Sequence, residues 1–273
     1  MGSWMSSRWL TVTVATVLPC SYVALVQLFD KDGTNRDDPR SIRKRFVGST
    51  VSSLLSLTYT YHVLKEITDD PLFEMGIRTH NLPFAIISPF ILMNTLYLGQ
   101  YVMIYYEGGL SRLWSLQEWK ESLTSLAWIR DVIMGPITEE IVFRCCSAAM
   151  FNQVLSFPLT VMLAPLSFAL SHFHHVFDDR RKGFTLNEAL GRRAFQFGYT
   201  YIFGVFSTYL LLKTNHCAVP IVAHAVCNSF GLPRIGDIVT FPQAKQRHII
   251  WAGYTTGLIL FLYLLPRIFC PLS

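Results

Sequence analysis

The chain has 273 residues, and its composition excludes most soluble protein classes. Apolar residue types make up 51% of it and charged residues only 15%, against roughly 25% charged in ordinary globular proteins. An aromatic content of 14% excludes an intrinsically disordered chain, and six cysteines are too few for a disulfide scaffold. The basic residues behind the net charge of +5 lie between apolar blocks, which favours a membrane protein over a nucleic-acid binder.

Apolar segments recur along the whole chain at lengths that suit a bilayer, because a transmembrane helix needs about 20 mostly apolar residues. The segment 107–130 mixes charged residues with leucines and tryptophans, which predicts an amphipathic helix lying in the membrane interface. We therefore predict an all-α, polytopic integral membrane protein that forms a single membrane-embedded domain over residues 1–273. The eight predicted spans are 9–29, 46–64, 82–106, 131–151, 154–173, 194–213, 218–232 and 248–269.

The basic residues are distributed unevenly between the two sides of this predicted topology. Seventeen of the 23 lysines and arginines lie in the loops 30–45, 107–130, 174–193 and 233–247. Five lie on the opposite side, and Arg144 lies inside a span. Cytosolic loops carry an excess of Lys and Arg. The four basic loops are therefore predicted to face the cytosol, with both termini on the other side.

Ionisable residues inside apolar helices are costly and usually functional, and the first group is GPITEEIVFR at 135–144. Pro136 suits the first turn of a helix. Glu140 and Arg144 are four residues apart, so they share a helix face and are predicted to pair. Glu139 then points in another direction and is predicted to be available for chemistry. A purely structural ion pair between helices is the alternative interpretation of these charges.

Two further polar groups lie in predicted spans. Phe168 and His172 are four residues apart in SFALSHFHH, and His224 and Asn228 are four apart in VAHAVCNSF. A carboxylate with an imidazole can activate a water as general base. An imidazole with a carboxamide can donate hydrogen bonds to a developing oxyanion. Combined with Glu139, these residues indicate a hydrolytic site, although a lone buried histidine is often only a core residue.

Three other mechanisms use the same segments. A thiol protease would use Cys145, Cys146 or Cys227, although free cysteines are commonly small buried residues. A zinc protease would use Glu139, His172 and His224 as ligands, but the sequence contains no HExxH motif. A proton-coupled transporter would use the intramembrane Glu and His residues, although the chain shows no two related halves.

The three motifs in order resemble those of the type II CAAX prenyl endopeptidases, the Ras-converting branch of the glutamate-dependent intramembrane proteases. The family's EExxxR, FxxxH and HxxxN correspond to Glu139–Arg144, Phe168–His172 and His224–Asn228. The stretches RDDPRSIRKRF, SHFHH and AFQFGYTYIFGVFSTYLLLKTNH are similar to the eukaryotic members. The resemblance covers most of residues 35–235.

This resemblance implies removal of the last three residues from prenylated C-a-a-X proteins, such as Ras-type GTPases carrying a farnesyl or geranylgeranyl chain. It implies a catalytic core at about 107–232, in a multi-pass protein of the endoplasmic reticulum membrane whose active site is accessible from the cytosol. Glu139 and His172 would activate the water, and His224 and Asn228 would stabilise the oxyanion. Glu140, Arg144 and Phe168 would support them. No metal or cofactor is expected, and membrane lipid is the expected surrounding.

Overall fold

The computed structural model describes residues 2–31, 35–269 and 272, and all regular structure in these ranges is helical. The predicted all-α class is therefore confirmed. Contacts divide the chain into two compact units, one of residues 1–79 and 137–220 and the other of residues 80–136 and 221–273. Each unit is described by itself, and the single domain over 1–273 stays a prediction.

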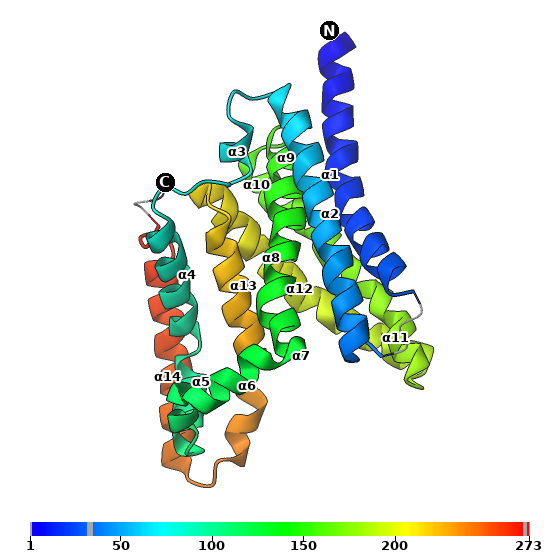
Figure 1. Ribbon diagram of the computed structural model, residues 1–273. Helices are drawn as coiled ribbons and strands as arrows, with labels where there is room; N and C mark the ends of the chain where they lie inside the picture. Colours follow the sequence, from blue (N-terminus) through cyan, green and yellow to red (C-terminus); the bar gives the residue numbers. More distant parts are fainter. Residues whose placement is uncertain (1, 32–34, 270–271, 273) are drawn as a thin grey trace. The chain divides into compact units, whose positions relative to one another are not determined.

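The first unit is built from long helices around a short central run. Helices α1 and α2 pack together, as do α10 and α12, and the central element η3 contacts all four (Figure 1). Its apolar core includes Leu18 of α1, Leu64 of α2 and Phe143 of η3. The elements are α1 (Gly2–Phe29), α2 (Pro39–Lys65), α3 (Pro71–Glu74), α8 (Gly135–Glu140), η3 (Ile141–Ala148), α9 (Ala149–Asn152), α10 (Phe157–Ser171), η4 (His172–His174), α11 (His175–Arg181) and α12 (Leu186–Thr214).

Two helices of this unit begin earlier than the predicted spans because polar caps extend them. The Asp38 carboxylate accepts the backbone N–H of Arg40 at 2.7 Å, and Pro39 takes the first helical position of α2. Thr185 and Glu188 form a reciprocal capping box at the start of α12. The predicted spans 46–64 and 194–213 are therefore the apolar parts of longer helices.

The second unit packs its last helix against a bent pair. Helix α14 contacts both α4 and α5, which meet at Tyr97 with a bend of 63°. A Cβ at Gly99 would lie only 2.2 Å from the ring of Tyr254, so glycine permits this close packing of α5 on α14. The elements are α4 (Leu82–Leu96), α5 (Leu98–Tyr106), η1 (Leu110–Trp114), α6 (Leu116–Thr124), α7 (Leu126–Trp128), η2 (Ile129–Met134), α13 (Ala218–Phe230), η5 (Ile235–Thr240) and α14 (Ala244–Leu264).

The prediction of one interfacial helix over 107–130 is only partly right. This segment forms three short helices, η1, α6 and α7, separated at Ser115 and Ser125. Both serines accept a backbone N–H from three residues on and so start new helices. The apolar side chains remain exposed, with Trp114 at 85% and Leu116 at 87%. An amphipathic surface is therefore present, but on a broken path.

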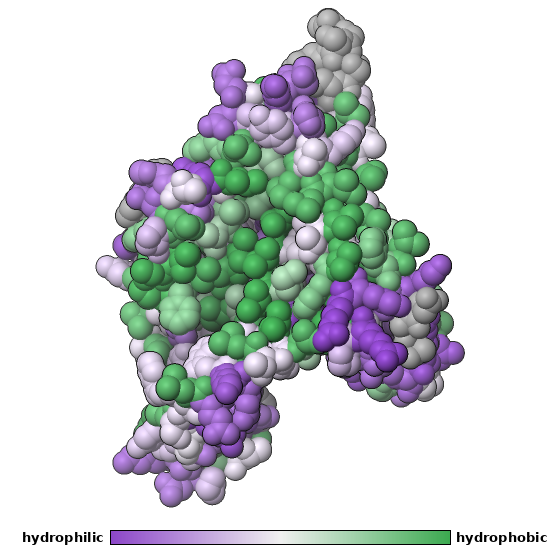
Figure 2. Space-filling model, in the orientation of Figure 1, coloured by the Kyte–Doolittle hydropathy of each residue, from purple (hydrophilic) through white to green (hydrophobic). Residues whose placement is uncertain are grey.

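The helices carry an apolar exterior. On the face shown in Figure 2, hydrophobic residues cover the long helices, and hydrophilic residues gather around α11 and the turn between α2 and α3. Large apolar side chains lie exposed on α2 and α12, for example Leu54 at 59% and Ile202 at 71%. By length and hydropathy, Arg8–Phe29 passes as a span alone and the α4–α5 pair passes together. These findings agree with a membrane protein, and the count of eight spans stays a prediction.

The predicted span 131–151 is helical, but it is not a uniform α-helix. The short α-helix α8 lies between two π-helical segments, η2 before it and η3 after it. A π-helix closes hydrogen bonds five residues apart and is rare, and it frequently marks a functional site. The Glu139–Glu140 pair lies in α8, directly before the second of these segments.

Candidate active site

The two adjacent glutamates have different surroundings. Glu140 is fully buried and accepts hydrogen bonds from Arg144 Nη1 at 3.1 Å and Ser207 Oγ at 2.5 Å. The predicted Glu140–Arg144 pair is thus present, with a third partner from α12. Glu139 is only partly buried. The Glu140 carboxylate is therefore enclosed in the protein, whereas Glu139 lies at the margin of the buried region.

The Arg144 side chain is also fully enclosed, at 1% exposure. Its guanidinium carbon lies 4.2 Å from the centroid of the Phe168 ring and 5.8 Å from that of Phe203. The Nε and Nη2 atoms have no hydrogen-bond partner, so the negative faces of these two rings provide their electrostatic contact. Phe168, the first residue of the second motif, is therefore a direct neighbour of Arg144.

The residue before Glu139 is held from two neighbouring helices. The Thr138 hydroxyl and the Tyr22 hydroxyl lie 2.9 Å apart, and Ser53 Oγ donates to the Thr138 carbonyl at 3.4 Å. Thr138 is 4% exposed. Contacts from α1 and α2 thus restrain the backbone that carries Glu139. Sequence analysis did not identify Tyr22, because its partner lies 116 positions away.

His172 begins η4, directly after α10 ends at Ser171. Its Nδ1 lies 2.9 Å from the carbonyl oxygen of Phe168, so a neutral imidazole donates its Nδ1–H there. This contact assigns the Nε2 atom the acceptor role. The His172 ring also packs edge-on against the Phe168 ring, with centroids 5.0 Å apart. One phenylalanine therefore orients both the histidine and the arginine of the motifs.

His224 and Asn228 lie on α13 in the second unit. His224 is 5% exposed, whereas Asn228 is exposed. The Asn228 Nδ2 donates to the backbone carbonyl of Asp131 on η2 at 2.7 Å. Sequence analysis did not predict this contact, because it joins residues 97 positions apart. The amide of Asn228 is therefore oriented by main chain rather than by another side chain.

The end of α13 is held by side chains from the bent pair. Tyr97 Oη donates to the Gly231 carbonyl at 2.9 Å, and Gln100 Nε2 donates to the Phe230 carbonyl at 3.1 Å. The Tyr97 ring stacks on Phe230 with centroids 4.7 Å apart. Carbonyls at a helix end lack intrahelical donors, and the bond from Gln100 satisfies that of Phe230, the last residue of α13. The helix carrying His224 and Asn228 therefore has an anchored C-terminal end.

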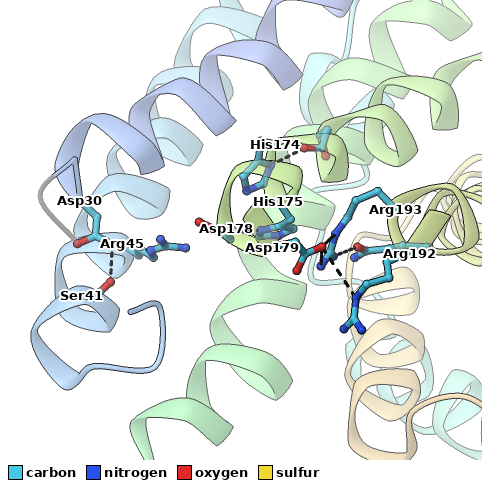
Figure 3. Close-up of polar contacts among 11 residues, drawn as sticks. Asp30, Ser41, Arg45, His174, His175, Asp178, Asp179, Arg192 and Arg193 are labelled. Atoms are coloured by element: carbon cyan, nitrogen blue, oxygen red, sulfur yellow. Dashed lines mark hydrogen bonds and ion pairs between the residues drawn. The ribbon is translucent and has the colours of Figure 1, made fainter. Parts of the chain in front are cut away.

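A polar cluster follows His172 in the first unit. Figure 3 shows Arg45 and Asp30 near the α1–α2 turn, and His174, His175, Asp178 and Asp179 around α11. The imidazole of His175 bonded to Asp178 lowers the pKa of that carboxyl to about 2. Burial, together with the neighbouring His175, lowers the pKa of His174 to about 4. His174 is therefore neutral at pH 7. Further ion pairs join Asp30 to Arg45 and Asp179 to Arg192 and Arg193.

The cysteines considered for a thiol mechanism are engaged in other contacts. Cys145 and Cys146 are fully buried on η3, with Cys217 beside Cys145 and Thr60 beside Cys146. Cys227 contacts Tyr97. Among the described residues, no histidine is a neighbour of the two buried thiols in these contacts, so the contacts do not support a Cys–His pair there.

Comparison with known proteins places these residues in a family. Residues 121–230 match the family described as Type II CAAX prenyl endopeptidase Rce1-like, and this range includes all three motifs. CAAX prenyl protease 2 of Caenorhabditis elegans is 46% identical over 252 residues, which are 92% of this chain and 95% of that protein. The chain belongs to the type II CAAX prenyl endopeptidase family.

Membership of this family makes the chain a protease, and other relatives agree. CAAX prenyl protease 2 of Homo sapiens is 31% identical, over 96% of this chain and 82% of that protein. The Arabidopsis thaliana protein of the same name is 27% identical, over 84% of this chain and 78% of its own length. No solved structure matches the chain. The roles of the individual motif residues remain predictions.

Proposed function

We propose that the chain cleaves the aaX tripeptide from prenylated C-a-a-X proteins, with Glu139 as general base on the attacking water. The observation that carries this proposal is the separation of the two glutamates. Glu140 is buried between Arg144 and Ser207, so its carboxylate has a structural role. Glu139 lies at the margin of the buried region, next to the restrained Thr138. A base must reach a water, and only the second environment allows it.

The chemical steps follow from the site residues. Glu139 takes a proton from water, and the resulting hydroxide attacks the backbone carbonyl carbon of the prenylated cysteine. His172 holds its Nδ1–H on the Phe168 carbonyl and directs the Nε2 lone pair to the water. His224 and Asn228 donate to the oxyanion. The proton held by Glu139 then passes to the departing amine, which leaves as the aaX tripeptide.

The surroundings of the site suit a lipidated substrate. Exposed apolar side chains cover the helices, so the farnesyl or geranylgeranyl chain can stay in the bilayer while the peptide reaches the carboxylate. The polar cluster around α11 lies on a basic loop that is predicted, from the excess of Lys and Arg, to face the cytosol. We therefore propose action at the endoplasmic reticulum membrane on cytosolic substrates, among them Ras-type GTPases.

The test is cleavage of a farnesylated C-a-a-X peptide by purified full-length enzyme. Wild type should release the tripeptide and leave the unprenylated peptide intact. Glu139→Gln should remove activity while accumulating normally, because the amide keeps the shape but takes no proton. Glu118→Gln, an exposed glutamate on α6, is the matched control and should retain activity. Wild-type turnover by Glu139→Gln would contradict the general-base role.

Two further arms separate the alternative protease mechanisms. The first arm measures activity with a strong chelator, together with the metal content of the purified enzyme. Activity that persists in the chelator supports the glutamate mechanism. Stoichiometric zinc in wild type that is lost together with activity in His224→Ala would establish the zinc alternative. A triple variant of Cys145, Cys146 and Cys227 to alanine should retain most activity. Its complete inactivity in folded protein would support a thiol nucleophile.

A further inference from the structure

The π-helical turn before α8 arranges its carbonyls in an unusual way. The backbone N–H of Gly135 donates to the carbonyl of Arg130, five residues back. A Cβ at Gly135 would lie 2.9 Å from that same oxygen, so glycine allows the carbonyl to approach. The i to i−5 pattern of a π-helix is thus established at this residue.

The next N–H in this pattern is missing. Continued by one residue, the pattern would bring an N–H at position 136 to the carbonyl of Asp131. That position is Pro136, which has no backbone N–H. Gly135 already donates to Arg130, so neither of these two residues supplies Asp131 with a backbone donor. Pro136 is itself buried.

The donor that reaches this carbonyl comes from the third motif. Asn228 Nδ2 donates to the Asp131 oxygen at 2.7 Å, and all the residues involved belong to the second unit. We propose that Pro136 is a positioning residue for the reaction: by withholding an N–H from Asp131, it reserves that carbonyl for Asn228 and so orients the Asn228 amide.

The chemistry of the amide explains why orientation matters. A carboxamide offers two N–H donors on one nitrogen and an acceptor oxygen on the other side. With one N–H on Asp131, the nitrogen is the anchored end, and the second N–H is the donor for an oxyanion. A rotated amide would present its oxygen and repel the developing charge. This inference rests on the oxyanion role of Asn228 proposed above.

The test restores or withholds an N–H at position 136 in the full-length enzyme. Pro136→Ala introduces an N–H that competes for Asp131. Pro136→lactate, made with the α-hydroxy acid analogue of alanine, has the same methyl side chain but no N–H. Pro136→Ala should lower kcat about three- to tenfold, the equivalent of one net hydrogen bond, with little change in KM. Pro136→lactate should restore most of the rate.

A double-mutant cycle distinguishes positioning from a merely structural effect. If Pro136 acts through Asn228, Pro136→Ala should cost kcat no further in an Asn228→Ala background. Equal losses in both backgrounds, or an unchanged kcat for Pro136→Ala in wild type, would overturn the proposal. Wild-type activity of Asn228→Ala alone would instead refute the oxyanion role on which the proposal rests. Pro89→Ala, within α4 of the same unit, is the control and should keep the wild-type rate.

A second variant leaves Pro136 untouched, in case Pro136→Ala does not fold. Val132→α-hydroxyisovalerate turns the Asp131 carbonyl into that of an ester, which is a weaker hydrogen-bond acceptor. It should lower kcat in the wild-type background and have little effect in Asn228→Ala. The same loss in both backgrounds would overturn the proposal independently of position 136.

Discussion

The first unit and the second unit hold their polar motif residues by different means. In the first, Glu140 and Arg144 neutralise one another in a fully buried setting, with Ser207 and the Phe168 ring around them. In the second, Asn228 is exposed and donates to a main-chain carbonyl, that of Asp131. One arrangement depends on enclosing charge, and the other on orienting a neutral amide.

This difference predicts that the buried ion pair controls stability and that the Asn228 amide controls turnover. Removing one partner of a buried ion pair leaves an uncompensated charge, so the cost falls on folding. An exposed amide with one anchored N–H contributes little to folding and acts on a charge that develops during the reaction. Changes to the buried Glu140–Arg144 pair should therefore lower stability, and changes at Asn228 should lower turnover in a stable protein.

The largest effect is expected from breaking the buried pair. Arg144→Met should lower the free energy of unfolding by about 3–5 kcal/mol, because Glu140 then stays buried without its cation. Thermal unfolding in detergent measures this loss. Arg192→Met is the control. The Arg192 side chain is exposed, and its Nε lies 4.0 Å from Asp179 Oδ2, so this variant should cost about 1 kcal/mol or less. Equal effects of the two variants would contradict a structural role for the buried pair.

The complementary change concerns turnover. Asn228→Ala should lower kcat by about 10²–10³, or about 2.7–4 kcal/mol in the barrier, with little change in KM. Steady-state cleavage of a prenylated peptide gives both constants, and thermal unfolding should show a nearly unchanged midpoint. Ser229→Ala removes a neighbouring exposed side chain that donates to the Ala225 carbonyl within its helix, and should stay active. A large loss of stability in Asn228→Ala would remove the contrast between the units.

A smaller loss of stability is expected from overpacking the space around Arg144. A Cβ at Gly204 would lie 2.8 Å from the Cβ of Pro165 and 3.3 Å from Arg144 Nη2. Gly204→Ala should therefore destabilise the first unit by about 1–3 kcal/mol. Gly198→Ala on the same helix meets nothing within 4 Å and should be neutral or stabilising by up to about 1 kcal/mol. A neutral Gly204→Ala would show that α10 and α12 can separate without cost.

The smallest effect concerns pH. The pKa of His174 is lowered to about 4, below about 6.5 in an unfolded chain, so the unfolded state binds more protons between these values. Stability should therefore fall as pH drops from about 6.5 towards 4. His174→Gln keeps a donor for the Ser171 carbonyl, at 2.5 Å from His174 Nδ1, and should lose less stability over this range. His80→Gln, an exposed histidine, should follow wild type, and an identical profile for His174→Gln would contradict the assignment.

The sequence by itself determined the helical class, the three motifs and the local pairs within them. Glu140 with Arg144, and Phe168 with His172, are four residues apart, so helix geometry alone brings them together. The early start of α12 was not predicted, although Thr185 and Glu188 have the spacing of a capping box. The apolar composition indicated a membrane environment, because composition can be read from the sequence without knowledge of any long-range contact.

Only the tertiary structure decided what surrounds these pairs. Ser207 and Phe203 reach the Glu140–Arg144 pair from α12, and the Asp131 carbonyl reaches Asn228 across 97 positions. The π-helical turns around α8 also had no local signal, because a hydrogen-bond shift of one residue leaves the hydrophobic pattern almost unchanged. Local spacing dictates which side chains share a helix face, whereas the partners of a buried charge or an anchored amide depend on which distant helix packs against that face.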